Sequence, residues 1–304
     1  MVYSIVYFII EKTSKTVELY HSIKQNKRRI VMKIFIDSAD IDEIAQAYSW
    51  GIVDGVTTNP SLLKAAVDKR KAKGESLDME AYIAKLLEIS KPNPVSLEVT
   101  KRTAKEMIAQ GRTIYKRFNS IAKNVNIKIP VNPAIQVNEQ CHFDGINAVK
   151  VLQSEGIPVN CTLVFTPEQA LLAAKAGAAY ISPFAGRIDD YIRSSAHIKF
   201  DKSDYFPEEG IEQNGVLLHD NGIVSGIDVV SQCVEIVTYY EYKSEIIAAS
   251  LRNPRQVREA ALAGAHIATV PFGVIAQMLR HEKTFEGMKK FTDDIVPEYE
   301  KLIG

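Results

Sequence analysis

Cysteine is scarce in this chain of 304 residues, which contains only Cys141, Cys161 and Cys233. The number is odd, the spacings are wide and no CxxC pair occurs. The sequence therefore predicts free thiols in a reducing compartment, and we expect a cytoplasmic protein. His142 follows Cys141, but no second pair stands at the spacing of metal ligands, so we expect no metal site.

An excess of one charge is also missing, because Lys plus Arg and Asp plus Glu both total 37. This balance gives no support to a nucleic-acid partner or an acidic membrane surface. The first apolar run, Val2–Ile10, is too short to span a membrane and lacks the flanks of a signal peptide. We therefore expect neither nucleic acid nor membrane as a partner. Residues 1–31 are interpreted as an N-terminal extension, either disordered or forming a short added strand or hairpin.

From Met32 onward, short apolar runs alternate with longer helical stretches. Eight strands alternating with helices predict an α/β protein, a single (β/α)8 TIM barrel over residues 32–304. An open doubly wound sheet is the alternative, weakened because no GxGxxG follows the first strand. The predicted strands are Lys33–Asp37, Ile52–Thr57, Pro94–Val99, Asn126–Ile129, Pro158–Phe165, Ala179–Pro183, Glu245–Ala249 and His266–Val270.

Three segments depart from the regular alternation. A long polar segment follows the sixth strand, and we expect its part 191–221 to be an inserted loop. A second long loop, 131–144, follows the fourth strand. Because both are expected to follow strands, both should rim the mouth of the barrel, where long loops are often functional. The chain closes with one amphipathic helix, predicted over Phe285–Leu302.

Lys128 lies in the string NVNIKIP (Asn124–Pro130), a β-branched run that stops at a proline. Apolar residues flank the lysine, which is typical of a strand buried on both faces. A lysine there must place its ammonium in a polar site at the strand end or lose its proton. A desolvated amine is the starting material for Schiff-base chemistry on a carbonyl substrate. The alternative is a strand-end lysine that reaches solvent.

Polar residues end the other predicted strands as well, and in a barrel these ends meet at one mouth. Each has a structural explanation of its own: Asp37 could cap a turn, Asn59 could form an Asx-turn, and Thr162 could bond to backbone. Their convergence around one lysine favours a site. The strand ends carry Asp37, Thr57, Thr58, Asn59, Glu98, Lys128, Asn160, Thr162, Ser182, Phe184, Ser250 and Arg252.

Five segments resemble, in order and spacing, motifs of the transaldolase family, which includes the fructose-6-phosphate aldolases. The resemblance covers about Met32 to Leu279 and implies a class I aldol mechanism that needs no metal and no cofactor. The segments are Val56–Ser61 (VTTNPS), Ile127–Pro130 (IKIP), Asn160–Phe165 (NCTLVF), Ser182–Asp189 (SPFAGRID) and Ala249–Asn253 (ASLRN).

The resemblance also implies roles for the catalytic residues. Lys128 would attack the C2 ketone of a ketose phosphate, and the resulting imine would draw electrons from the breaking C3–C4 bond. Asp37 would take the proton of the C4 hydroxyl. Glu98 and Thr162 would hold a water that carries protons during imine formation and hydrolysis.

Substrate binding is implied for a further set of residues. Asn59, Asn160 and Ser182 would bond the sugar hydroxyls, beside Phe184. The phosphate would be held by Arg187, Ser250 and Arg252, because arginine forks match phosphate oxygens. For Arg187 the alternative is an ion pair with Asp189 or Asp190.

Two positions favour group transfer over simple cleavage. Glu98 and Phe184 stand where the resembling aldolases carry Gln and Tyr, and phenylalanine cannot donate the proton that releases the enamine. We therefore expect a transaldolase of the non-oxidative pentose phosphate pathway. It would pass a dihydroxyacetone unit from fructose 6-phosphate or sedoheptulose 7-phosphate to an aldose phosphate.

Two other functions stay open. One is a fructose-6-phosphate aldolase that releases free dihydroxyacetone. The other is a non-catalytic barrel that binds sugar phosphates. The expected partners are sugar phosphates and further copies of the chain in a homo-oligomer, because small members of the family form rings through their C-terminal helices.

Overall fold

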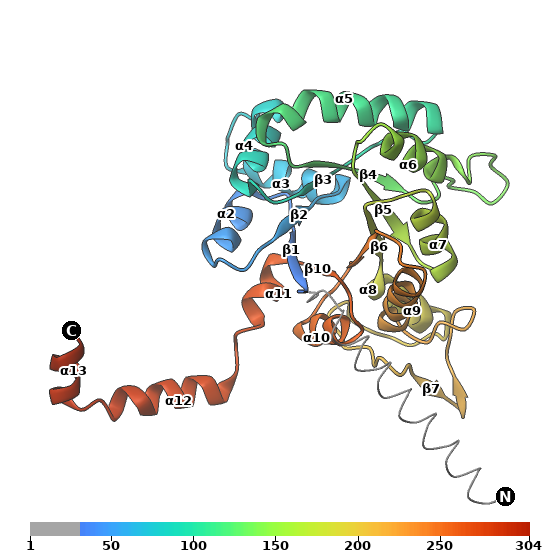
Figure 1. The fold of residues 1–304 in the computed structure, drawn as a ribbon. Helices are drawn as coiled ribbons and strands as arrows, with labels where there is room; N and C mark the ends of the chain where they lie inside the picture. The colour runs from blue at the N-terminus through green and yellow to red at the C-terminus, as the bar shows by residue number, and fades with distance from the viewer. Residues whose placement is uncertain (1–30) are drawn as a thin grey trace, which may run out of the picture. The chain divides into compact units, whose positions relative to one another are not determined.

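The computed structural model describes residues 31–304, so the predicted N-terminal extension lies almost wholly outside the described residues. Eight parallel strands close into one barrel in the order β1-β10-β9-β6-β5-β4-β3-β2, with helices around it (Figure 1). The predicted TIM barrel is confirmed. The barrel strands are β1 (Lys33–Asp37), β2 (Gly55–Thr57), β3 (Val95–Glu98), β4 (Val125–Pro130), β5 (Val159–Val164), β6 (Tyr180–Pro183), β9 (Glu245–Ala248) and β10 (Ile267–Val270).

Helices follow the strands with well-defined starts. Asn59, Thr166 and Asn253 each precede a proline and accept a hydrogen bond from the N–H three residues on, so the same side-chain cap starts α3, α7 and α10. The first eight helices are α2 (Ile41–Ser49), α3 (Pro60–Ala72), α4 (Met79–Ser90), α5 (Ala104–Ala122), α6 (Asp144–Ser154), α7 (Pro167–Lys175), α8 (Ala185–Ser195) and α9 (Gly226–Tyr239). The chain continues with α10 (Pro254–Leu262), α11 (Phe272–Gln277), α12 (Glu282–Asp293) and α13 (Pro297–Ile303). No helix within residues 31–304 is long and apolar enough to cross a membrane.

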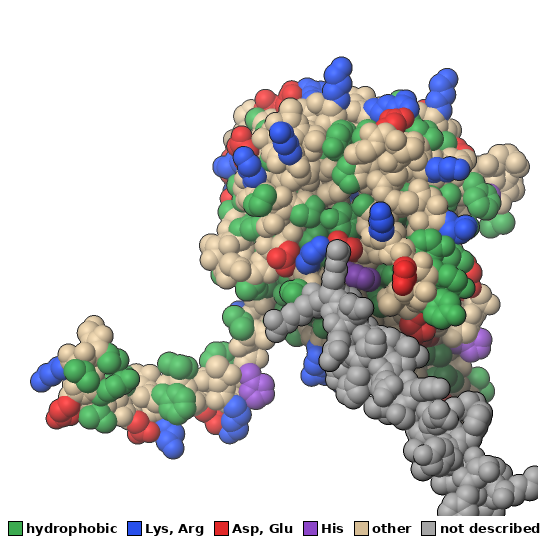
Figure 2. Space-filling model, viewed as in Figure 1, with side chains coloured by type: hydrophobic (Ala, Val, Ile, Leu, Met, Phe, Trp, Pro, Cys, Tyr) green, Lys and Arg blue, Asp and Glu red, His purple; other side chains and the backbone are tan. Residues whose placement is uncertain are grey.

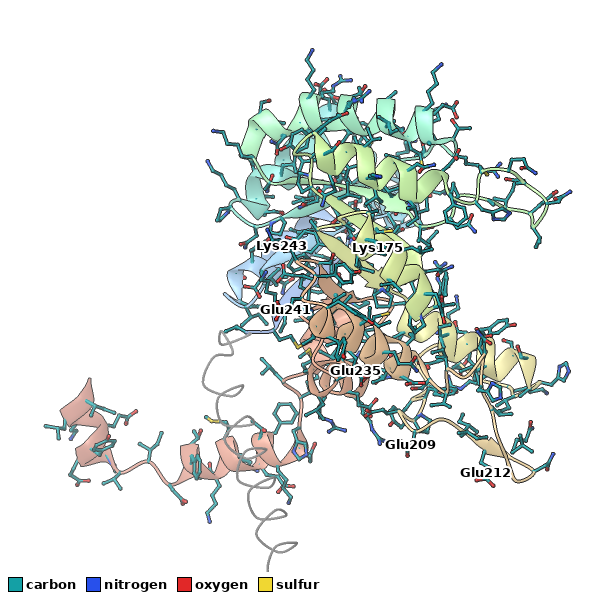
Figure 3. All side chains as sticks on the ribbon, turned by 45° about the vertical axis from the view of Figure 1, so that its right-hand side comes forward. Lys175, Glu209, Glu212, Glu235, Glu241 and Lys243 are labelled. Carbon is teal, nitrogen blue, oxygen red and sulfur yellow. The ribbon has the colours of Figure 1, made fainter. Side chains whose placement is uncertain are left out.

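The predicted loop 191–221 overlaps the end of a helix, so its start and the strand that it was expected to follow are wrong. Its first part is helix α8, and residues 196–225, here called the insert, follow that helix rather than a strand. The insert contains a small hairpin, β7 (Glu212–Gln213) with β8 (Val216–Leu217), and Figure 3 labels Glu209 and Glu212 on it. Sequence reasoning missed α8 because its N-cap, Phe184, makes no side-chain cap bond.

The insert is tied to the barrel helices by specific contacts. Arg193 on α8 donates to the carbonyl of Tyr205 at 2.6 Å, and the Tyr205 hydroxyl donates to Glu259 on α10 at 2.7 Å. Phe206 is fully buried, and the Ser225 hydroxyl donates to the carbonyl of Glu208. These bonds give the insert a defined path over α8 and α10.

The single C-terminal helix predicted over Phe285–Leu302 is also wrong. Two helices, α12 and α13, replace it, and the break falls just before Pro297. A proline has no N–H for the helical ladder and disfavours helical backbone at the residue before it. Neither helix has a buried residue.

Gly226 allows α9 to start directly against the first residue of α8. A Cβ at Gly226 would lie 2.1 Å from the Ala185 carbonyl oxygen, whereas a Cβ at Gly273, near the start of α11, would meet nothing within 4 Å. We expect Gly226→Ala to lower the free energy of unfolding by about 1–3 kcal/mol through overpacking, and Gly273→Ala to leave it unchanged or slightly higher. Denaturant unfolding of the two variants checks this, and equal midpoints would contradict it.

Candidate active site

Lys128 is enclosed in the barrel, with its side chain only 4% exposed. Its ammonium donates to the Thr58 carbonyl oxygen at 3.0 Å and lies 3.3 Å from a carboxylate oxygen of Glu98. The alternative of a lysine reaching solvent does not hold, because the ammonium is held inside by one carbonyl and one carboxylate. An amine enclosed in this way can attack a carbonyl compound that enters the barrel mouth.

Strand register places the neighbours of the lysine. Glu98 on β3 pairs with Lys128 on β4, which pairs with Asn160 on β5, so the three residues form one row across three strands. The amide of Asn160 donates to the Ser96 hydroxyl at 3.1 Å and accepts from the Ser182 hydroxyl at 2.7 Å. These two hydrogen bonds hold the side chain of Asn160 beside the lysine.

Asp37 lies at the end of β1, which β2 and β3 separate from the lysine strand β4. It accepts a hydrogen bond from the Thr57 hydroxyl at 2.7 Å, and Thr57 also contacts the hydroxyl of Thr269 on β10. Burial raises the pKa of Asp37 above its ordinary 3.8, against the opposing positive charge of Lys128. The carboxyl group is therefore a better proton acceptor than an exposed aspartate once it is ionised.

Glu98 has a similar environment. Burial raises the pKa of Glu98 above its ordinary 4.5, and the charge of Lys128 opposes this shift. Asp37 and Glu98 thus supply two carboxyl groups near one amine, each with a shifted protonation equilibrium. Such a pair is typical of sites that move protons to and from an intermediate.

Thr162 is fully buried, and its hydroxyl has no hydrogen-bond partner among the described residues. The register of β5 shifts between Cys161 and Val164, and Leu163 within this bulge has a left-handed φ of 56°. Bulges often re-aim side chains next to active sites. An unpartnered buried hydroxyl beside the lysine strand fits the predicted binding of a water.

A cavity of about 100 Å³ brings most of the predicted residues together. It contains both the amine and the carboxyl group needed for an aldol reaction, together with polar side chains that can bond hydroxyls. The lining residues are Asp37, Thr57, Asn59, Lys128, Ser182, Phe184, Arg187, Ala249, Ser250 and Thr269.

The three predicted phosphate residues differ in position. Arg187 and Ser250 line the cavity, and the Arg187 guanidinium lies 5.1 Å from the centre of the Phe184 ring. Arg252 is not among the lining residues and pairs instead with Asp190. The alternative predicted for Arg187 was an ion pair with one of two acids of α8. Asp190 does form an ion pair, but with Arg252 and not with Arg187.

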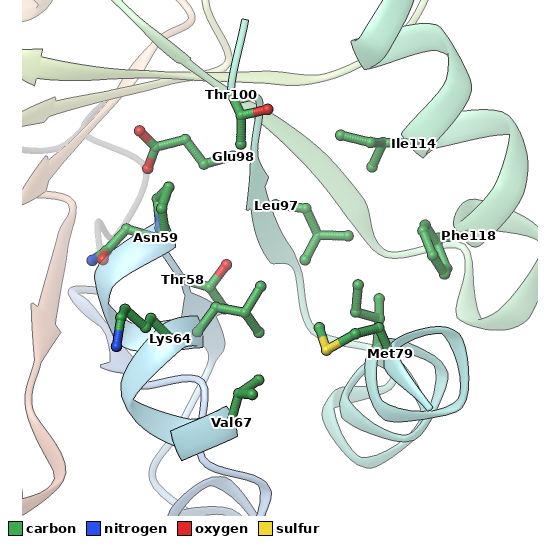
Figure 4. A pocket seen from close by; sticks show the side chains of 13 residues that line it. Thr58, Asn59, Lys64, Val67, Met79, Leu97, Glu98, Thr100, Ile114 and Phe118 are labelled. Carbon is green, nitrogen blue, oxygen red and sulfur yellow. The ribbon is translucent and has the colours of Figure 1, made fainter. Parts of the chain in front are cut away.

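A second, largely apolar cavity of about 340 Å³ lies beside the first, between α3, α4 and α5 (Figure 4). Asn59 and Glu98 stand at its polar edge, and Leu97 and Phe118 are among the apolar residues that Figure 4 labels. Asn59 lines both cavities. It also caps α3, so the Asx-turn expected for it and its place in the site occur together.

Sequence reasoning missed several partners of the site. Ser96 and Thr269 were not proposed as site residues, and the Thr58 carbonyl was not expected to hold the lysine. A serine or threonine inside a barrel strand gives no local signal, because only closure of the barrel brings it to the site.

Residues 34–302 match the family described as Transaldolase/Fructose-6-phosphate aldolase. The chain belongs to this family. Its membership confirms the resemblance found in the five motifs.

Three relatives show how far the similarity extends. Each is named "Probable transaldolase". The protein of Prosthecochloris aestuarii is 43% identical over 264 residues, which cover 86% of this chain and 97% of the relative. That of Desulfatibacillum aliphaticivorans is 42% identical over 270 residues, 89% of this chain and 99% of the relative. That of Clostridium perfringens is 40% identical over 270 residues, 89% of this chain and all of the relative.

Proposed function

We propose that this member of the transaldolase/fructose-6-phosphate aldolase family is a transaldolase that works through a Schiff base on Lys128. The observation that carries the proposal is the enclosed amine of Lys128, 3.3 Å from Glu98, in a site that Asp37 also lines. Binding of a sugar phosphate alone would not require an amine buried between a carboxylate and a carbonyl. The arrangement therefore favours catalysis over a purely binding barrel.

In the proposed reaction, the neutral amine attacks the C2 ketone of fructose 6-phosphate or sedoheptulose 7-phosphate, and loss of water gives an imine. Asp37 removes the C4 hydroxyl proton while the C3–C4 electrons flow into the imine, and an aldose phosphate leaves. The remaining dihydroxyacetone unit stays on Lys128 as an enamine. The enamine carbon then attacks the aldehyde of a second aldose phosphate, Asp37 returns its proton, and water releases the new ketose phosphate.

Water must be held during imine formation and hydrolysis. Glu98 and the unpartnered hydroxyl of Thr162 are the groups proposed for this task. Asn59, Ser182 and, through its bond to Ser182, Asn160 are proposed for the sugar hydroxyls. Arg187, Ser250 and Arg252 are proposed for the phosphate.

Transfer is proposed over simple cleavage because Phe184 lines the cavity, where its ring lies against the ring of Phe165 and the Arg187 guanidinium. It has no hydroxyl to deliver a proton to the enamine. The enamine therefore persists until an aldehyde acceptor reacts with it. In an aldolase it would instead be protonated and released as free dihydroxyacetone.

The test is an acceptor experiment. The protein is incubated with fructose 6-phosphate, with and without erythrose 4-phosphate, and sedoheptulose 7-phosphate and free dihydroxyacetone are both measured. We expect sedoheptulose 7-phosphate to form only with the acceptor, and little dihydroxyacetone in either case. Release of dihydroxyacetone at the same rate with and without acceptor would instead establish the aldolase. No conversion of either kind by the folded protein would contradict both.

A homo-oligomer is proposed as the working form. Helices α12 and α13 have no buried residue, and Figure 2 shows hydrophobic side chains gathered on them. Apolar patches of this kind mark protein–protein contacts. The exposed apolar residues of the two helices and of the turn between them are Phe285, Met288, Phe291, Ile295, Val296, Tyr299, Leu302 and Ile303.

We expect the double variant Phe285→Ser with Phe291→Ser to shift the protein from an oligomer toward the 33.9 kDa chain mass in light scattering. The matched control, Lys283→Ser with Lys290→Ser on the same helix, should keep the oligomer. An oligomer of unchanged mass in the double phenylalanine variant would contradict the role of α12.

The three cysteines are free, in keeping with the proposed cytoplasmic location.

A further inference from the structure

We propose that Asp190 is a positioning residue that holds Arg252 in the orientation needed to grip the substrate phosphate, with the insert as its support. The inference rests on the proposed function of the site. Asp190 follows Asp189 on α8, 62 residues before Arg252, and the two side chains are 21% and 17% exposed. The ion pair is therefore shielded from most of the solvent and is better defined than a surface pair.

The geometry of the pair is a two-armed fork. Arg252 Nη2 donates to one oxygen of Asp190 at 2.6 Å, and Nη1 donates to the other oxygen. Nη1 also donates to the carbonyl of Lys202 in the insert at 3.3 Å. A guanidinium held by a bidentate carboxylate and a third acceptor has little freedom left.

These three bonds leave two of the five donors of the arginine. They are the Nε–H and the second Nη2 hydrogen, which lie on one edge of the planar guanidinium. Neither has a hydrogen-bond acceptor among residues 31–304. An edge with two parallel N–H donors matches two oxygens of a phosphate, so Asp190 selects which edge of Arg252 is presented.

Asp189, the residue before Asp190, fixes the main chain of Arg252 through the side chain of Gln256. The backbone N–H of Arg252 donates to the side chain of Gln256 at 2.8 Å, and Gln256 donates to Asp189 at 2.8 Å. The other oxygen of Asp189 accepts from the Gly226 N–H at 2.6 Å. Two consecutive acids of α8 therefore hold the same arginine, one through its guanidinium and one through its backbone.

Close packing brings this arginine to the predicted phosphate end of the site. A Cβ at Gly186 would lie 2.3 Å from the Ser250 carbonyl oxygen and 2.9 Å from Arg252 Nε. Arg252 Nε thus lies beside the first turn of α8, where the next residue, Arg187, lines the cavity. Ser250, which also lines the cavity, has a left-handed φ of 62°, a strained conformation that the surroundings must enforce.

The test compares Asp190→Ala and Asp190→Asn with the wild-type protein. Either substitution frees the Arg252 side chain to adopt other rotamers, which should raise KM for fructose 6-phosphate roughly three- to ten-fold. It should leave kcat within about two-fold and weaken inhibition by inorganic phosphate by the same factor as KM. Labelling of Lys128 by dihydroxyacetone and borohydride, which involves no phosphate, should be unchanged. Asp190→Glu should restore part of the affinity, because it keeps the carboxylate.

A matched control breaks another bidentate arginine–carboxylate pair elsewhere. Glu155 binds Arg112 through two bonds on the protein surface, one of them from Nε at 2.9 Å. Glu155→Gln should leave KM, phosphate inhibition and labelling unchanged.

The outcomes separate the positioning role from the proposed function. An unchanged or lower KM in folded Asp190 variants, with Lys128 labelled normally, would overturn the positioning role alone. Absence of labelling in the wild-type protein would overturn the Schiff-base function. If inorganic phosphate still bound the wild-type protein and bound the variants more weakly, the positioning role would stand on that measurement.

Discussion

Replacing Lys128 with methionine is expected to lower kcat for transfer on the order of 10⁵-fold, as for enzymes that lose a covalent nucleophile. Methionine keeps an unbranched side chain of similar length in the barrel, but it cannot form an imine. The Thr58 carbonyl loses its hydrogen-bond donor, and the Glu98 carboxylate loses the positive charge beside it. The rate of sedoheptulose 7-phosphate formation measures the effect.

The matched control is Lys64→Met. Lys64 lines the neighbouring apolar cavity, and its side chain is 78% exposed and paired with Asp68. This control should keep the wild-type rate. A Lys128→Met protein that retains more than a few per cent of activity, with a normal unfolding transition, would contradict a covalent role for Lys128.

Asp37→Asn is expected to lower kcat by about 10²–10⁴-fold, the usual contribution of a general acid–base. Its effect should be confined to making and breaking the C3–C4 bond. Lys128 should therefore still be labelled by dihydroxyacetone and borohydride, because this adduct forms without cleavage. Measuring transfer and labelling on the same preparation separates the two steps.

The pH dependence provides a second readout for Asp37. Burial raises the pKa of this carboxyl above 3.8, so the base is lost when the pH falls through that raised value. We expect kcat/KM to fall on the acid side at a pH above 3.8, and this limb to change in Asp37→Asn. The side chain of Asp42 is 62% exposed, so the control Asp42→Asn should keep the wild-type profile. An Asp37→Asn protein with the wild-type rate and the wild-type pH profile would contradict the assignment of Asp37 as the base.

The eight strands and the mouth residues could be predicted because they depend on local patterns. Runs of β-branched residues ending at Asp37, Glu98 or Pro130 mark strand ends, and parallel strand ends must meet at one mouth. Helix α8 could not be predicted in the same way, because its start lacks a capping side chain and its sequence is polar. The break before Pro297 was signalled by the proline, although the amphipathic pattern continues across it.

The part of the site that escaped prediction consists of long-range contacts. Asp190 stands three residues after Arg187, so sequence spacing favoured that pair, yet its partner is Arg252. The insert carbonyl of Lys202 joins the same guanidinium. Such contacts depend on how β6 and β9 pair in the closed barrel and on the path of the insert, and neither is encoded in a local pattern.

Borohydride trapping tests the central claim most directly. The wild-type protein is incubated with fructose 6-phosphate, reduced with borohydride and digested, and the modified peptide is identified by mass spectrometry. We predict a single adduct with the mass of the reduced sugar unit, on the peptide that contains Lys128, and none in Lys128→Met. A folded protein without an adduct, or with the adduct on another lysine, would contradict the Schiff-base account.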